Sequence, residues 1–159
     1  MTIEIRFAER SDVPLIVRLI KALAVYERLE QVVVANEDKV ERALFGPRPY
    51  AETLIAEDGG QPVGFALFFH NFSTFLAQPG IYLEDLFVEP EQRGKGVGRA
   101  LLVRLAQIAV ERDCGRLEWA VLDWNKDAIA FYERLGAKPN EDWTVYRLTG
   151  EPLRSLAGE

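Results

Sequence analysis

Cysteine, histidine and long apolar runs are scarce in this chain. Its 159 residues include one cysteine, Cys114, and one histidine, His70. An intrachain disulfide is therefore excluded, and a metal site or a catalytic triad that depends on histidine is disfavoured. No uninterrupted apolar run reaches the ~18 residues that a membrane span requires, and residues 1–6 show no apolar signal region. We therefore expect a cytoplasmic protein that uses no metal and does not enter a membrane.

An excess of positive charge is also missing. Lysine and arginine number 19 against 25 aspartates and glutamates, so the net charge is −6. Nucleic-acid binding is disfavoured, because phosphate backbones select broad basic surfaces. An acidic surface suits a small cationic partner such as an amine, although the same charge also serves solubility. The length fits a single domain, residues 1–159, and no internal repeat interrupts it.

Glycines and cations gather where a predicted strand, residues 81–88, gives way to a predicted helix, residues 96–113. The first N–H groups of a helix lack intrahelical partners and lie at the positive end of its dipole. Glycines let such N–H groups approach an anion closely, and the nearby side chains add full positive charge. The sequence therefore predicts a pyrophosphate cradle. Its expected residues are Gln92, Arg93, Gly94, Lys95, Gly96, Val97, Gly98 and Arg99.

Two other phosphate loops fit less well. No G-x-x-x-x-G-K-[ST] run exists, and G-x-G-x-x-G fails at Arg99, where the third glycine would stand. Residues 92–98 instead contain the pattern [QR]-x-x-G-x-[GA], and residues 125–137 match N-x-x-[AS]-x-x-F-Y-x-[KR]-x-G-[AF]. With these two motifs in this order, the chain resembles the GNAT superfamily of N-acetyltransferases. The resemblance implies that the glycine-rich loop holds the pyrophosphate of acetyl-coenzyme A.

Periodicity along the chain predicts an α/β fold. The expected strands are residues 3–7, 53–57, 62–69, 81–88, 116–122 and 143–148, with 81–88 as the central strand. The expected helices run from about Asp12 to Tyr26, from Asn36 to near Gly46, from Gly96 to Asp113 and from Asn125 to Gly136, and residues 71–80 are expected to be an irregular loop. Asn36 is expected at the start of its helix, the turn at 58–60 indicates a hairpin, and the helix after Gly96 has an apolar stripe that includes Leu101, Leu105 and Ile108. The order β-α-α-β-β-β-α-β-α-β is that of a GNAT-like mixed central β-sheet flanked by helices.

Acetyl transfer to an amine needs a base for the amine proton and an acid for the departing thiolate. The resemblance implies that Tyr132 is the general acid, whereas helical spacing alone favours a core aromatic. Glu84 and Asp85 are neighbouring carboxylates in an otherwise apolar strand, on opposite faces if the strand is regular. Because burying a carboxylate is costly without a partner, we interpret Glu84 as the base and Asp85 as a substrate-binding residue. A salt bridge, or ammonium binding without catalysis, would also account for them.

The resemblance also implies contacts to the coenzyme outside the loop. Backbone groups of Leu86, Phe87 and Val88 would pair with the pantetheine arm as an added strand does. Asn125 would touch a pantetheine amide as well as cap its helix. Phe131 is assigned to the coenzyme site too, although its spacing also fits the core.

Within the superfamily the chain most resembles the spermidine/spermine and thialysine acetyltransferase branch. Polyamine-acetylating relatives carry an aspartate and a tryptophan in the loop before the central strand, and residues 71–80 here have neither. Phe75 is left there for a cation–π contact, and Glu27 would add negative charge to the acceptor pocket. A lysine-like amino acid or a small diamine thus fits at least as well as spermidine. The same branch implies a homodimer.

Two other functions stay open at this stage. A protein lysine or N-terminal acetyltransferase would use the same chemistry on a different acceptor. A coenzyme A-binding sensor that has lost catalysis would keep the loop without the reaction, although Tyr132 and Glu84 are both present.

Overall fold

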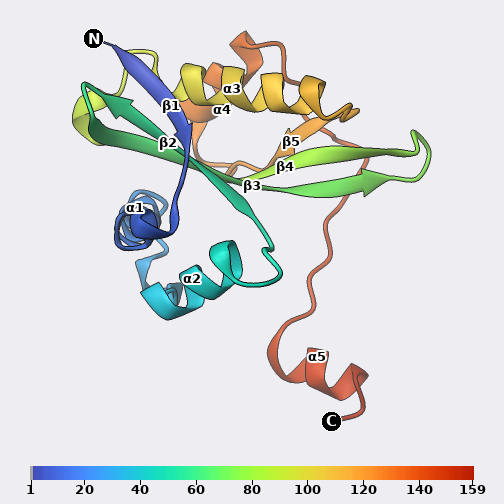
Figure 1. Cartoon of the computed structure of the whole chain (residues 1–159). Coiled ribbons are helices and arrows are strands. Elements are labelled where there is room, and N and C mark those ends of the chain that lie inside the picture. Colours follow the sequence, from blue (N-terminus) through green and yellow to red (C-terminus); the bar gives the residue numbers. More distant parts are fainter. Residues whose placement is uncertain (1) are drawn as a thin grey trace. The chain divides into compact units, whose positions relative to one another are not determined.

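A computed structural model describes residues 2–159. The chain divides into two compact units, Met1–Ala120 and Val121–Glu159, and each is described by itself. The larger unit holds a five-stranded sheet and three α-helices, and the smaller unit holds two further helices (Figure 1). Within residues 2–159 no helix is both long enough and apolar enough to cross a membrane. The expectation of one domain over residues 1–159 stays a prediction.

The sheet of the larger unit is mixed. Its strands are β1 (Ile3–Phe7), β2 (Glu52–Asp58), β3 (Gln61–Ser73), β4 (Gln78–Val88) and β5 (Leu117–Trp119). They lie in the order β1-β2-β3-β4-β5; the first four pair antiparallel and β5 pairs parallel with β4. The predicted α/β class with a mixed sheet is confirmed. The middle strand is β3, however, so the prediction that residues 81–88 form the central strand was wrong.

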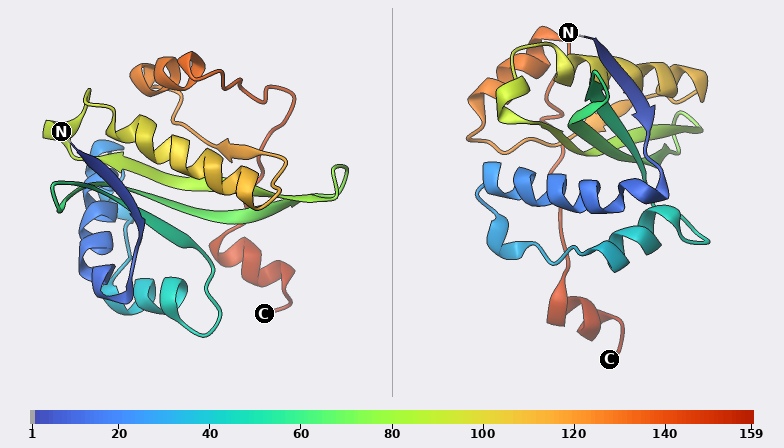
Figure 2. Two further views of the ribbon diagram at one scale, coloured as in Figure 1. Left: turned by 45° about the horizontal axis from the view of Figure 1, so that its top comes forward. Right: turned by 60° about the vertical axis from the view of Figure 1, so that its left-hand side comes forward.

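Helices cover both faces of this sheet. Helices α1 (Val13–Tyr26) and α2 (Glu37–Phe45) lie on one face and α3 (Val97–Glu111) on the other (Figure 2). On the first face Ile16 and Leu19 of α1 are fully buried in one cluster with Ile55, Phe65 and Phe87 of the sheet. The apolar stripe of α3 that the sequence predicted is likewise buried, at Leu101, Leu105 and Ile108 among others.

Short polar motifs set the ends of several elements. Asn36 caps α2 by accepting a hydrogen bond from the Lys39 amide at 2.9 Å. Gly59 and Gly60, both with positive φ, make the tight turn of the predicted hairpin between β2 and β3. Three-residue 3₁₀ turns fill the connections at Arg10–Asp12, Glu30–Val32 and Pro90–Gln92.

The segment predicted as an irregular loop, residues 71–80, is instead a regular hairpin. Asn71 pairs with Gly80 and Ser73 with Gln78, so that β3 and β4 continue out from the sheet (Figure 2). No apolar face marks this extension, since Phe72 and Phe75 are exposed. On the half-buried face Asn71 and Ser73 are polar, so the segment lacks the apolar alternation by which strands are recognised in a sequence, which is why the prediction failed.

The smaller unit contains α4 (Lys126–Arg134) and α5 (Gly150–Leu156). Asn125 caps α4 through the Ala128 amide at 3.3 Å, as predicted, and Gly136 follows the helix with φ at 92°. The predicted last strand, residues 143–148, is wrong: this segment belongs to no strand, and α5 after it was not predicted. Strand-like alternation makes a strand only where a partner strand can pair with it, and the described part of this unit contains none. The strand predicted at 116–122 is also shorter than expected.

Candidate active site

Two glycines shape the turn between β4 and α3. Gly94 and Gly96 have φ of 74° and 87°, a conformation that L-residues with side chains rarely adopt, and Gly96 is the residue immediately before α3. No atom within 4 Å would obstruct a Cβ at either position, so the backbone angle rather than crowding explains the glycines. The turn therefore presents the first amides of α3 at an open, positively polarised helix end. All eight predicted cradle residues lie in this turn or in the first turn of α3.

The cradle side chains differ in what they can offer a ligand. Val97 is buried, so only its backbone can reach an anion. Lys95 donates a hydrogen bond to the Gln92 amide oxygen at 3.2 Å. Arg99 is exposed and, with Ile5, Ala100 and other residues, lines a shallow groove of about 520 Å³. The motif [QR]-x-x-G-x-[GA] fits the loop with Arg93, Gly96 and Gly98 at its fixed positions, so Gln92 lies just outside it.

Strand β4 is paired on both edges only in part. Its ladder with β5 covers Ile81 to Leu83 alone, so from Glu84 onward β4 has β3 on one edge and no β5 residue on the other. The Glu89 amide donates to Val63 of β3 at 2.9 Å, and backbone groups of alternate residues point to opposite edges. Phe87 therefore faces β3, whereas Leu86 and Val88 face the open edge. Of the three residues predicted to pair with pantetheine, these two have backbone groups on that edge.

A β-bulge interrupts β4 at the predicted catalytic carboxylates. Leu67 pairs with Asp85 and Phe68 with Leu83, so Glu84 is the extra residue of the bulge. The bulge breaks the strict alternation that the sequence argument assumed for Glu84 and Asp85. Glu84 is exposed, while Asp85 is largely shielded from solvent. Asp85 is two residues from Phe87, which packs in the cluster formed with α1.

Three carboxylates influence one another at this place. Burial, with the negative charges of Glu84 and Glu27, raises the pKa of Asp85 to about 6. Burial and the charge of Glu84 likewise raise the pKa of Glu27, which directly follows α1. Burial, with the negative charges of Glu84 and then Glu118, also raises the pKa of Tyr82. The site is thus electronegative and suits a group that brings positive charge, such as an ammonium.

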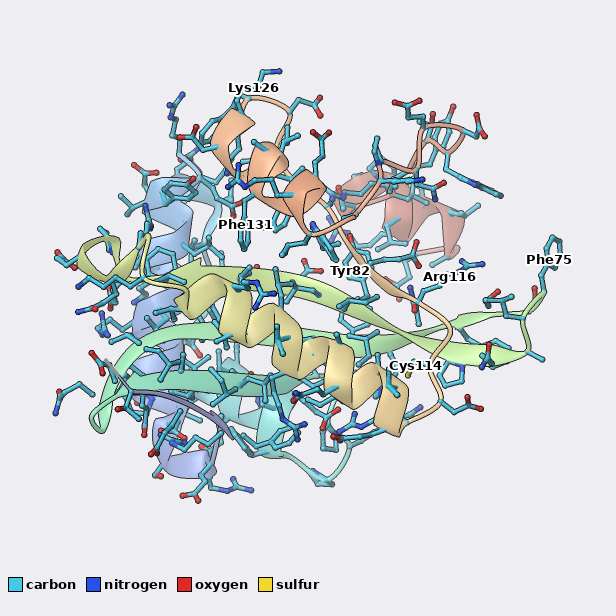
Figure 3. The ribbon with its side chains drawn as sticks, turned by 90° about the horizontal axis from the view of Figure 1, so that it is seen from above. Phe75, Tyr82, Cys114, Arg116, Lys126 and Phe131 are labelled. Atoms are coloured by element: carbon cyan, nitrogen blue, oxygen red, sulfur yellow. The ribbon has the colours of Figure 1, made fainter. Side chains whose placement is uncertain are left out.

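Phe75 is not part of this cluster within one chain. Its side chain is fully exposed, and Figure 3 shows its ring at the outer tip of the β3–β4 hairpin. At ~3.3 Å per residue, the stretch of β4 from Gln78 to Asp85 alone is about 23 Å long. The structure therefore brings Glu27, Glu84 and Asp85 together and leaves Phe75 at the far end of the strand.

The remaining predicted residues lie in the smaller unit. Asn125 caps α4, and Phe131 and Tyr132 lie in its second half with ring centroids 5.5 Å apart. The Tyr132 carbonyl accepts hydrogen bonds from the amides of Leu135 and Ala137 and so ends the helix. The roles of Tyr132, Phe131 and Asn125 toward the coenzyme stay predictions.

Several contacts at the site were not foreseen. Arg93 donates from Nε to the Val88 carbonyl at 3.0 Å, and its guanidinium carbon lies 4.6 Å from the Tyr26 ring centroid. Arg18 of α1 forms an ion pair with Glu89 at 2.7 Å. Both join α1, or the residue that ends it, to the end of β4. Nothing in the spacing marks the contacts of Arg93 with Tyr26 and of Arg18 with Glu89, because these partners are about 70 positions apart in sequence.

Comparison with known proteins agrees with this geometry. Residues 19–137 match the acetyltransferase (GNAT) family. The chain belongs to the GNAT family of acetyltransferases. It is similar to a thialysine N-epsilon-acetyltransferase of Bos taurus, with 39% identity over 166 residues covering 98% of this chain and 97% of that protein. It is therefore an N-acetyltransferase, an enzyme that transfers an acetyl group to an amine.

Two further relatives widen the range of acceptors within this GNAT group. An L-ornithine N5-acetyltransferase of Arabidopsis thaliana is 34% identical, with 96% of this chain and 86% of that protein covered. A spermidine/spermine N(1)-acetyltransferase-like protein of Homo sapiens is also 34% identical, over 98% of this chain and 24% of that longer protein. Among solved structures, an integron cassette protein from the V. cholerae mobile metagenome aligns over 100% of this chain and 99% of its own, with a TM-score of 0.83 at 28% identity.

Proposed function

We propose that this acetyltransferase moves the acetyl group of acetyl-coenzyme A directly to the primary amine of a small molecule, without a metal. The observation that carries the proposal is the carboxylate group Glu27, Glu84 and Asp85 at the place where β4 loses its β5 partner. There the uncovered edge of β4 offers backbone groups for an acyl carrier, and the three carboxylates offer negative charge for an amine. The acceptor class is a lysine-like amino acid, a diamine or a polyamine.

The coenzyme would be held by backbone groups at two points. The amides at the start of α3, with Lys95 and Arg99, would bind the pyrophosphate, since anions are stabilised at helix N-termini. The open edge of β4 at Leu86 and Val88 would pair with the pantetheine amides. Asn125 and Phe131 of α4 complete the coenzyme set that the family resemblance implies.

The reaction needs three proton movements. A carboxylate takes a proton from the ammonium, and the amine nitrogen forms a bond to the thioester carbon. The carbon–sulfur bond then breaks as the thiolate takes the Tyr132 hydroxyl proton, and the nitrogen loses its second proton, which restores that hydroxyl. Glu84 is the proton acceptor expected from the sequence. Asp85 is a second candidate, because a pKa of about 6 suits a base that works near neutral pH.

The acceptor assignment rests on chemistry and on relatives together. Relatives are named for thialysine, ornithine and spermidine/spermine, and each of these acceptors carries a primary amine on an aliphatic chain. The hairpin at residues 71–80 has no carboxylate and no tryptophan for a second cationic centre. This favours lysine-like amino acids and short diamines over long polyamines. We further propose a cytoplasmic homodimer that does not bind nucleic acid, in line with the −6 net charge.

Thiol release from acetyl-coenzyme A against a panel of amines tests the proposal. The panel is lysine, thialysine, ornithine, short diamines, spermidine, spermine and a lysine peptide. We expect release with a short diamine or a lysine-like amino acid and little with spermine. Release with the peptide alone would establish a protein acetyltransferase instead. No thiol release with any amine of the panel, together with tight coenzyme A binding by calorimetry, would favour a non-catalytic sensor.

A further inference from the structure

Arg93 belongs to the glycine-rich loop, yet its side chain turns back on the sheet. Its Nε donates to the Val88 carbonyl at 3.0 Å. Its guanidinium carbon lies 4.6 Å from the centroid of the Tyr26 ring and 5.4 Å from that of Phe87. Guanidinium groups within about 6 Å of an aromatic centroid are attracted to the ring. One side chain therefore joins three elements: the end of α1, the end of β4 and the loop.

The partners of Arg93 lie next to residues that the proposed function uses. Tyr26 is the last residue of α1, and Glu27, one of the three carboxylates, follows it. The chain leaves the helix sharply there, with Arg28 at a φ of 61° and the Leu29 amide bonded to Ala24 at 2.8 Å. Phe87 is two residues beyond Asp85. A contact that fixes Tyr26 against Phe87 therefore also fixes the separation of Glu27 and Asp85.

The bond to Val88 has a consequence for the coenzyme. The Val88 carbonyl lies on the open edge of β4, and Arg93 already occupies it. A pantetheine arm added to this edge could then pair with the amide and carbonyl of Leu86 and with the Val88 amide, and its pairing would end at Arg93. In a basic loop this guanidinium would be expected to face a phosphate. Here it instead closes the edge at Val88 and stacks on the rings of Tyr26 and Phe87.

We propose that Arg93 is a positioning residue, which holds Glu27 beside Asp85 and closes the β4 edge at Val88, and is not a phosphate ligand. This inference rests on the proposed function, because it assigns the residue a role toward the amine. Lys95 and Arg99, for which residues 2–159 show no hydrogen bond or ring contact to the sheet, remain the phosphate-binding cations of the loop.

The test compares Arg93→Gln and Arg93→Lys with Arg99→Gln. Exposed Arg48 of the α2–β2 connection, for which the structure shows no ion pair, supplies Arg48→Gln as the matched loss of one charge. Loss of two ring contacts and one charge-assisted hydrogen bond should raise the amine KM of Arg93→Gln about tenfold. The coenzyme A dissociation constant of Arg93→Gln should change less than threefold, and the slope of coenzyme A affinity against salt concentration should stay close to that of the wild type. Arg99→Gln should instead weaken coenzyme A binding and reduce its salt dependence, with little change in the amine KM. Arg48→Gln should match the wild type.

Tyr26 supplies a second, independent pair of variants. Tyr26→Leu removes the ring under the guanidinium and should raise the amine KM in the same way, whereas Tyr26→Phe keeps the ring and should raise the amine KM much less than Tyr26→Leu does. The amine KM of the double variant Arg93→Gln/Tyr26→Leu should be no higher than that of the poorer single variant, since both substitutions break the same Arg93–Tyr26 contact.

Two results would overturn the proposal. One is a loss of coenzyme A affinity in Arg93→Gln as large as that in Arg99→Gln, with the same drop in salt dependence. The other is an unchanged amine KM in both Arg93→Gln and Tyr26→Leu. Failure of the proposed function is distinct from both, because it would appear as absent acetyl transfer in the wild type itself.

Discussion

The two halves of β4 lie in one strand but in different surroundings. From Gln78 to Leu83 the strand is part of a hairpin and, over its last three residues, is paired on both edges. From Glu84 to Val88 it starts with a bulge, carries the shielded Asp85 and has an edge that β5 does not cover. The first half gives the sheet its continuity. The second, open half has the carboxylates and the uncovered edge that the proposed chemistry uses.

The difference shows how a sheet can form a site by leaving pairing incomplete. Unpaired backbone groups at a strand edge are a template for another extended chain. A bulge redirects side chains at the same point. If the proposed function depends on the second half of β4, changes that disturb this half should alter catalysis or binding, and changes elsewhere in the sheet should alter stability alone.

Removal of the proposed general acid, Tyr132, should have the largest effect. Tyr132→Phe should lower kcat by about 10²- to 10³-fold, because the thiolate loses its proton donor, with general acid catalysis usually contributing in that range. Steady-state kinetics and coenzyme A calorimetry on the same preparation check this. A normal kcat in Tyr132→Phe would remove the residue from the mechanism.

The carboxylates of the open half should respond differently to pH. If Asp85 accepts the amine proton, wild-type kcat/KM rises as pH increases through about 6, and Asp85→Asn loses this limb together with about 30- to 100-fold in rate. Glu84→Gln would then keep the limb. The reverse pattern, in which only Glu84→Gln loses the limb, would assign the base to Glu84 as the sequence suggested.

The same residue links pH to stability. Because folding raises the pKa of Asp85 above its ordinary value, its contribution to stability is complete below the unfolded pKa and is lost as pH rises through about 6. The charges that act on it are Glu84 and Glu27. Asp85→Asn should therefore be about 1–2 kcal/mol more stable than the wild type at pH 7, with the difference shrinking toward pH 4. Urea unfolding at the two pH values measures this, and an equal difference at both would contradict the assigned burial.

Two glycines offer a matched pair, one for each half of β4. Gly80 lies in the first half, and Gly64 of β3 pairs with Val88 in the second. A Cβ at Gly64 would lie 2.7 Å from the Phe87 carbonyl oxygen, and a Cβ at Gly80 would collide with the Asn71 side chain. Either alanine variant should destabilise the fold by about 1–3 kcal/mol through overpacking. Only Gly64→Ala, which pushes the open half, should also weaken coenzyme A binding. Equal losses of binding in the two variants would show that the halves are not functionally distinct.

The smallest expected effect lies away from β4 and serves as its control. The Thr53 hydroxyl on β2 is buried, and no hydrogen-bond partner for it lies within the described residues 2–159. Thr53→Val keeps the shape and removes the unsatisfied group, so the protein should gain about 1 kcal/mol with unchanged kinetics. Thermal unfolding and the standard assay check both parts. A destabilised variant would indicate that the hydroxyl has a partner, such as a bound water.

The sequence predicted the elements with strong periodicity or clear end signals. The stripe of α3, the Asn36 and Asn125 caps and the Gly59–Gly60 turn are local features that depend on a few neighbouring residues. The hairpin at residues 71–80 and the absence of a strand at 143–148 were missed, because one lacks an apolar face and the other lacks a partner. Local pattern does not encode either condition.

The site shows the same division. The glycine loop and the Glu84–Asp85 pair were recognisable because each is a run of adjacent residues. The bulge that realigns the carboxylates, the contribution of Glu27 to the charge and the contacts of Arg93 depend on segments distant in sequence, so they became visible only in three dimensions.

Amide hydrogen exchange along β4, with and without coenzyme A, tests the central claim most directly. If the open half binds the coenzyme as an added strand, the Leu86 and Val88 amides gain strong protection when coenzyme A is added, while Ile81 to Leu83 change little. Unchanged exchange at Leu86 and Val88 in a saturated complex would contradict the account, as would uniform protection of the whole strand.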